Sequence, residues 1–125
     1  MKTIAIALFL GFNFIMTAQD PYLQKGDERA EALAQMILEK YDKELSMGAE
    51  QRILFENKLI EFLIREDKIK NLDMSVRDKL KTLTRLLTQE TAEMRNILTR
   101  PQWRYYKKLK KRYQPVVVEV GKVNH

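Results

Sequence analysis

Residues 75–98 read SVRDKLKTLTRLLTQETAEMRNIL, and this stretch decides the expected fold. Its apolar side chains recur every three or four residues, which places them on one face of an α-helix. Ser75 precedes the pattern and Asp78 follows three residues later, as is typical of a helix N-terminus. We therefore predict a long amphipathic helix that begins after Ser75. Its apolar face comprises Val76, Leu80, Leu83, Leu87, Met94 and Leu98, flanked by Leu86 and Ile97.

Three further helices are predicted around this one. The first runs from about Glu28 to Glu44, with Asp27 as its N-cap, and the second from about Ala49 to Asn71. The last begins after Thr99 and ends before Pro115. The sequence thus predicts an all-α fold of four helices. The first helix has an apolar stripe of Ala30, Leu33, Ala34, Ile37 and Tyr41, and the last has one of Trp103, Tyr106, Leu109 and Tyr113.

The composition allows one small domain and argues against several kinds of active site. The chain has 125 residues, no Cys and a single His, which is the last residue, His125. Disulfides, thiolate zinc sites, cysteine nucleophiles and histidine-based metal or acid–base sites are therefore not expected. Carboxylates at helical spacing, such as Glu90 and Glu93, are interpreted as solvated surface charges. We expect a binding protein that is not an enzyme, without catalytic residues, metal or cofactor.

The first 18 residues have the pattern of an export signal. Lys2 is followed by an apolar run from Ile4 to Ile15 and by a small residue, Ala18, at the expected cleavage position. The run is shorter than the roughly 20 residues that a membrane-spanning helix needs. A retained anchor or a buried first helix is the alternative. The predicted organisation is a signal peptide at 1–18, a helical domain at 19–113 and a mobile tail at 114–125.

Charge is unevenly divided along the chain. From Asp20 to Asp67 there are 12 acidic and 7 basic residues, whereas from Lys68 to His125 there are 5 acidic and 15 basic residues. In a cytosolic protein a basic half of this kind would suggest nucleic acid as partner. In an exported protein it fits acidic polypeptide segments or an anionic membrane surface better. The candidate contact residues on the last helix are Arg104, Lys107 and Lys111.

The second predicted helix has an unusually broad apolar surface. At 3.6 residues per turn its apolar side chains cover an arc of roughly 200°, about twice the width of an ordinary amphipathic stripe. We interpret the excess as a surface for another subunit or a bound polypeptide. The alternative is that this helix is central to the core of the monomer. The candidate surface residues are Phe55, Leu59, Phe62 and Ile69.

Two similar motifs open the second and last helices. Residues 98–102 read LTRPQ, a capping box in which Thr99 accepts from the Gln102 amide and Gln102 reaches back to the Thr99 amide. Residues 47–51 read MGAEQ, where Gly48 replaces the Thr and only the glutamine half of the box remains. The candidate motif and cap residues are Met47, Gly48, Gln51, Leu98, Thr99 and Gln102.

Together with the export signal and the Cys-free helical chain, these motifs resemble the L-T-x-x-Q family of periplasmic proteins that includes Spy and CpxP. The resemblance extends from the first helix through Tyr113. It implies a hairpin-like helical protomer that forms a curved homodimer in the periplasm. It also implies a role in envelope stress, as an ATP-independent chaperone or as a modulator of a stress-sensing kinase. Some relatives are linked to heavy-metal resistance.

Two functions are expected on these grounds. A chaperone would attract unfolded or partly folded proteins with its basic half and hold them on exposed apolar surface. A regulatory adaptor would use the same surface on one partner, the sensor domain of an envelope kinase. A metal-sensing function is less expected, because the chain has no internal histidine. Binding to a membrane surface is a weaker alternative. Nucleic acid is not expected as a partner.

If residues 1–18 are an export signal, expression of the full chain in a Gram-negative host should yield a processed protein that begins at or near Gln19. Mass spectrometry of the periplasmic fraction measures this directly. Recovery of the uncleaved chain from the membrane fraction would contradict the prediction.

Overall fold

The computed structural model describes residues 21–118, and their side chains from residue 28 onward. This part of the chain contains four α-helices, α2 (Pro21–Leu45), α3 (Ala49–Lys70), α4 (Val76–Met94) and α5 (Arg100–Tyr113). The predicted all-α fold is therefore confirmed. The expected signal peptide and the last seven residues of the expected tail lie outside the described residues.

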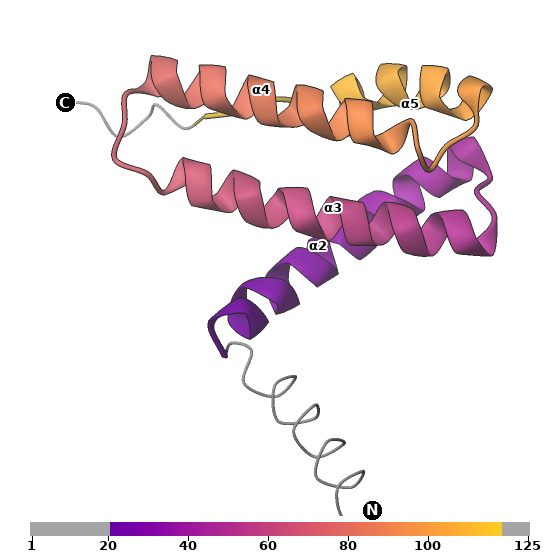
Figure 1. The fold of residues 1–125 in the computed structure, drawn as a ribbon, viewed down its shortest axis with the longest axis horizontal. Coiled ribbons are helices and arrows are strands. Elements are labelled where there is room, and N and C mark those ends of the chain that lie inside the picture. Colours follow the sequence, from indigo (N-terminus) through magenta and orange to yellow (C-terminus); the bar gives the residue numbers. More distant parts are fainter. Residues whose placement is uncertain (1–20, 119–125) are drawn as a thin grey trace, which may run out of the picture.

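The four helices form two layers (Figure 1). In the front layer α3 and α4 lie antiparallel, and in the rear layer α2 and α5 pack against each other. The connection between α2 and α3 and the connection between α4 and α5 lie at the same end of the molecule. Both helical hairpins therefore turn side by side, and contacts between the two turns can fix how the hairpins pack.

Three of the four helix starts agree with the sequence prediction. Ser75 accepts a hydrogen bond from the Asp78 amide at 3.1 Å and caps α4. The start of the first helix was predicted wrongly, because α2 begins at Pro21 and Asp27 lies inside it. Proline is well suited to a first helical position, where its missing amide hydrogen breaks no intrahelical bond. The periodic pattern from Glu28 onward therefore showed only the later part of this helix.

The turn between α2 and α3 is short and held by one carboxylate. Ser46 adopts a left-handed conformation with φ of 50° and donates its amide to the Asp42 carbonyl at 2.9 Å, a common way to end a helix. The Asp42 side chain accepts from the Met47 amide at 2.8 Å and pairs with Arg52 of α3. The chain thus reverses over three residues, which brings α3 back against α2.

An aromatic cluster forms the centre of the core. The ring of Tyr41 on α2 lies 5.2 Å from the rings of Phe55 on α3 and Tyr106 on α5, and 5.1 Å from that of Tyr113. Edge-to-face contacts at this distance stabilise a core beyond the burial of their area. Phe55 also contacts Tyr106, with centroids 5.7 Å apart. The cluster therefore joins three of the four helices.

The apolar face predicted for residues 76–98 is buried over only part of its length. Leu83, Leu87 and Met94 are buried, whereas Val76 and Leu80 are exposed at 37% and 39%. The reason is that α5, with 14 residues, is shorter than α4 and lies beside only the half of α4 nearest the turn between them. The N-terminal end of α4 consequently has no helix of the rear layer to cover it.

The predicted binding surface on the second helix is wrong for three of its four residues. Phe55, Leu59 and Phe62 have no exposed surface and belong to the interior, and Ile69 is partly buried. The apolar surface of this helix is broad because the helix packs on α2 along one side and on α4 along another. The exposed apolar side chains of α3 lie elsewhere, at Ile53 and Leu54.

The burial of Phe62 predicts a large loss of stability when its ring is removed. We expect Phe62→Ala to lower the free energy of unfolding by about 3–5 kcal/mol, because it removes a fully buried ring and leaves a cavity. Ile53→Ala is the matched control on the same helix, and since Ile53 is 61% exposed its effect should stay within about 0.5 kcal/mol. Urea denaturation of both variants tests this, and equal losses would contradict the assignment.

Candidate functional site

The two capping motifs meet through their glutamines. The Gln51 side-chain amide donates to Gln102 Oε1 at 2.7 Å, and the Gln102 amide donates to Gln51 Oε1 at 3.3 Å. Each side-chain oxygen also accepts from the backbone amide of its own N-cap, Gly48 at 3.0 Å and Thr99 at 2.9 Å. The predicted capping box at Thr99 is confirmed, since the backbone N–H of Gln102 donates to the Thr99 hydroxyl at 3.3 Å.

Each glutamine also reaches into the opposite turn. The side-chain amide of Gln51 donates to the Ile97 carbonyl at 3.0 Å, and the side-chain amide of Gln102 donates to the Leu45 carbonyl at 3.2 Å. The carbonyls near a helix end have no intrahelical partner, so these bonds satisfy groups that burial would otherwise leave unpaired. The motifs therefore do more than start two helices, because they join the two hairpin turns reciprocally.

The apolar residue at the head of each motif contributes to the core. Met47 and Leu98 are buried and belong to the same hydrophobic cluster as Tyr41, Phe55 and Tyr106. Of the candidate motif residues, only Gly48 makes no side-chain contact of its own. Its backbone conformation, with φ of −70° and ψ of 167°, is open to any residue. The backbone therefore does not require glycine at this position.

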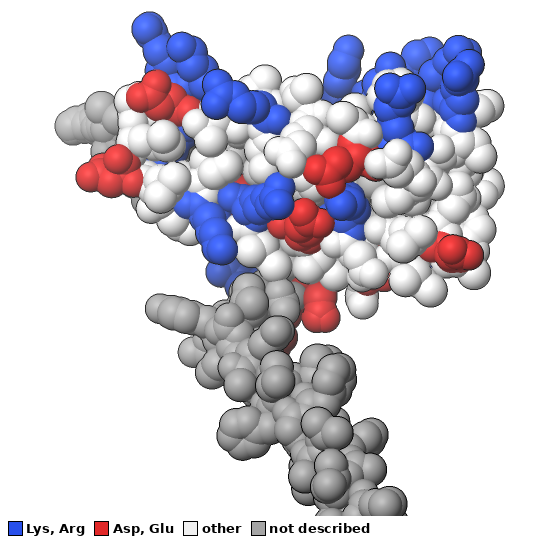
Figure 2. Space-filling model, viewed as in Figure 1, with Lys and Arg blue, Asp and Glu red and all other residues white. Residues whose placement is uncertain are grey.

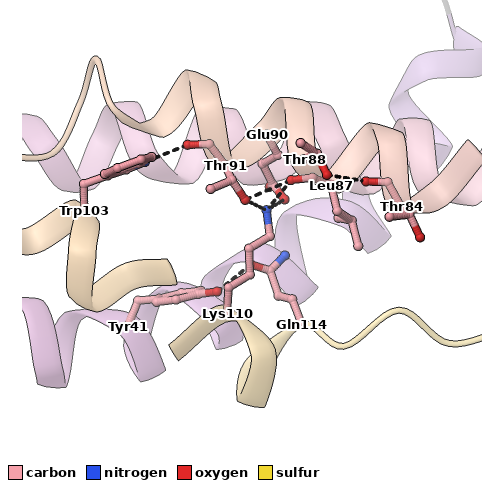
Figure 3. Close-up of polar contacts among 9 residues, drawn as sticks. All are labelled: Tyr41, Thr84, Leu87, Thr88, Glu90, Thr91, Trp103, Lys110 and Gln114. Carbon is pink, nitrogen blue, oxygen red and sulfur yellow. Dashed lines mark hydrogen bonds and ion pairs between the residues drawn. The ribbon is translucent and has the colours of Figure 1, made fainter. Parts of the chain in front are cut away.

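A buried charge pair joins α4 and α5 (Figure 3). Glu90 of α4 is fully buried, and its Oε1 accepts from Lys110 Nζ of α5 at 2.9 Å. Lys110 Nζ also donates to the Leu87 carbonyl at 2.8 Å and to the Thr91 hydroxyl at 2.9 Å. The interpretation of Glu90 as a solvated surface charge was wrong. Glu90 lies three residues after Leu87 and four before Met94, which are both buried, and this spacing is the signal that could have placed it in the interior.

Burial dominates the ionisation of this pair. Burial raises the pKa of the Glu90 carboxyl and lowers that of the Lys110 ammonium, while their mutual attraction partly opposes both shifts. Burial also raises the pKa of Glu66 on α3, which faces the same region. Among the described residues, Glu90 Oε2 and the Tyr106 hydroxyl are buried without a hydrogen-bond partner. The pair is therefore a fixed part of the core with incomplete polar compensation, and not a freely titrating surface group.

The outer face of α5 carries the basic surface expected from the sequence. Arg104, Lys107 and Lys111 are exposed there, as predicted. In Figure 2 Lys and Arg side chains gather along the edge of the molecule formed by α4 and α5. Trp103 docks the helix, because its indole nitrogen donates to the Thr91 carbonyl at 2.8 Å and Lys107 Nζ lies 3.8 Å from the ring centroid. Trp103 thus holds α5 so that Arg104, Lys107 and Lys111 remain exposed, whereas Lys110 points inward.

Among the side chains that the structure describes, no group of three or more could hold a metal ion, and none of the described helices is long and apolar enough to cross a bilayer. No family model matches the chain, and no match was found among curated proteins or solved structures. The resemblance to the L-T-x-x-Q family therefore rests on the motifs, and its functional consequences are proposals.

The reciprocal bonds predict energetic coupling between the two motifs. We expect Gln51→Ala and Gln102→Ala each to destabilise the protein, and the double variant to lose less than the sum of the two, by about 0.5–3 kcal/mol. The reason is that each single change also leaves the other glutamine without its partner. Urea denaturation of the four proteins gives the coupling.

Gly48→Ala is the matched control, because it removes no hydrogen bond and its added carbon would lie 3.9 Å from the nearest atom, Gln51 Oε1. It should have a smaller effect than Gln51→Ala. Strict additivity of the two glutamine changes would show that the turns are held together by other contacts.

The buried charge pair predicts a pH-dependent defect. Lys110→Met should cost about 3–5 kcal/mol near pH 7.5, because it leaves the Glu90 carboxylate buried and uncompensated. Part of this loss should return near pH 5, since the raised pKa of Glu90 makes the folded state bind a proton more tightly than the unfolded state. Urea denaturation at both pH values measures the difference.

The double variant Glu90→Leu/Lys110→Met is the control, because it removes both charges at once. It should be close to wild type or more stable, and should not recover on acidification. Equal destabilisation of Lys110→Met at the two pH values would contradict this account of the pair.

Proposed function

We propose that the mature protein is an exported, ATP-independent chaperone that binds unfolded or aggregation-prone polypeptides in the cell envelope. The proposal includes membership of the L-T-x-x-Q family and assembly as a homodimer. The two motifs, the pairing of their glutamines and the helical architecture support it.

One observation carries the proposal. Apart from Lys110, the six cations of α5 form no ion pair within the described part of the chain, so their charge remains available to a partner. Unpaired surface charge of one sign acts over several ångströms and accelerates encounter with oppositely charged segments. The cations are Arg100, Arg104, Lys107, Lys108, Lys111 and Arg112.

Once captured, an unfolded polypeptide would be bound through apolar side chains that lie outside the core. Met36 on α2 and Ile53 on α3 are 63% and 61% exposed, and Leu54 is exposed beside Ile53. These positions replace Phe55, Leu59 and Phe62 as the candidate contact surface. Apolar contacts of this modest extent favour loose binding, which suits a client that leaves when folding buries its own apolar residues. No nucleotide is needed for release in such a cycle.

Charge reversal on α5 tests the function. Arg104→Glu/Lys107→Glu/Lys111→Glu should slow capture of several unrelated denatured proteins and weaken suppression of their aggregation. The effect should be largest at low salt, because screening shortens the reach of charge to about 10 Å at 0.1 M ionic strength. Light scattering and stopped-flow mixing across salt concentrations provide the measurements.

The matched control reverses three exposed cations of α4, in Arg77→Glu/Lys81→Glu/Arg85→Glu, with the same change in net charge. Equal effects of the two triple variants would show that only net charge matters and would remove α5 as the contact surface. Capture restricted to one envelope sensor domain would favour the regulatory function over the chaperone.

A further inference from the structure

An open groove of about 540 Å³ lies between α4, the C-terminal half of α5 and the residues that follow it. One wall consists of Leu87 with Thr84 and Thr88 on α4, and the opposite wall includes Pro115 and Val116. The volume falls within the range of roughly 300–1,000 Å³ that is usual for small-molecule sites. The lining is mostly apolar, so the body of a ligand would have to be apolar as well.

The polar groups in the walls are largely committed to the protein itself (Figure 3). Lys110 uses its three donors on Leu87, Glu90 and Thr91. The Thr88 hydroxyl donates to the Thr84 carbonyl and the Thr91 hydroxyl to the Leu87 carbonyl, at 2.8 and 2.9 Å. Gln114 Oε1 accepts from the Tyr41 hydroxyl at 2.7 Å, which fixes the start of the opposite wall. The groove is therefore preformed.

Two cations of the lining form no hydrogen bond within the described part of the chain, although Lys107 Nζ also lies 3.8 Å from the centroid of the Trp103 ring. Lys107 and Lys111 lie one helical turn apart on α5, both are exposed, and neither forms an ion pair with any residue that the structure describes. No acidic side chain belongs to the lining. The polar groups of the groove that remain free for a ligand are thus positively charged, and they lie beside its apolar lining.

We propose that this groove binds a single-chain amphiphile that carries one anionic head group. The apolar chain would lie along Leu87, Pro115 and Val116, and the head group would bind Lys107 and Lys111. A bare inorganic anion would leave the apolar wall unused, and a cationic amphiphile would meet two like charges. The size of the groove favours such a molecule over a polypeptide. The proposal rests on the lining of the groove and not on chaperone activity.

Titration with laurate below its micelle concentration tests the site in the full mature protein. Trp103 is the only tryptophan of the chain and donates to the carbonyl of Thr91, a lining residue, so its fluorescence should report binding. We expect a saturable change with laurate and none with dodecyltrimethylammonium. Isothermal titration calorimetry measures the same affinity without depending on the environment of Trp103.

Two changes should weaken binding at least tenfold. Lys107→Gln/Lys111→Gln removes the head-group contacts, and Thr88→Phe fills the groove from an exposed helix position. Arg104→Gln/Lys108→Gln is the matched control, with the same loss of charge on the same helix but outside the lining, and should alter the affinity less than twofold. Circular dichroism checks the helix content of each variant, and Thr84→Phe replaces Thr88→Phe if the latter unfolds.

The proposal is overturned if laurate shows no saturable binding, if dodecyltrimethylammonium binds equally well, or if the control pair weakens binding as much as the groove pair. Saturable binding of an extended acidic peptide without binding of laurate would also overturn it and would assign the groove to a polypeptide. None of these outcomes depends on aggregation assays, so the site and the proposed chaperone function can fail separately.

Discussion

The packing of this protein depends on the reciprocal hydrogen bonds between Gln51 and Gln102. Four helices of moderate length can be combined in several ways, because apolar contacts alone are not directional. The paired amides are directional, and each glutamine is already fixed by its bond to an N-cap amide. Since each also reaches a carbonyl of the opposite turn, the two hairpins have one arrangement that satisfies every group at this end.

The buried pair of Glu90 and Lys110 also helps to specify how the helices pack, at a position farther along α5. An ion pair in a core seldom contributes much net stability, because removing both charges from water costs about as much as their attraction returns. It does specify position, since any sliding of α5 along α4 would leave a buried charge without its partner. The two polar contacts, one at each end of α5, thus determine the register of a helix whose aromatic residues could pack at several heights.

This positioning decides which surfaces remain free. Tyr106 and Leu109 are buried, so the cations on the other side of α5 face solvent, and the uneven distribution of charge along the chain becomes an uneven distribution in space. Because α5 ends well before the N-terminal end of α4, an open groove remains beside its last turn. The groove proposed for an anionic amphiphile follows from where this short helix stops, and the cations proposed for unfolded chains follow from which side of α5 is buried.

The sequence by itself determined the local features. Periodicity, caps and composition predict four helices, the start of α5 at the Thr99 box and the exposure of Arg104, since each depends on neighbours within a few residues. Tertiary structure alone decided the rest. Gln51 and Gln102 are 51 positions apart, and Phe62 and Glu90 each occupy faces that local pattern could assign to surface or interior. Whether such a face is buried depends on which distant helix packs on it, and that choice is made by directional polar contacts that no local pattern encodes.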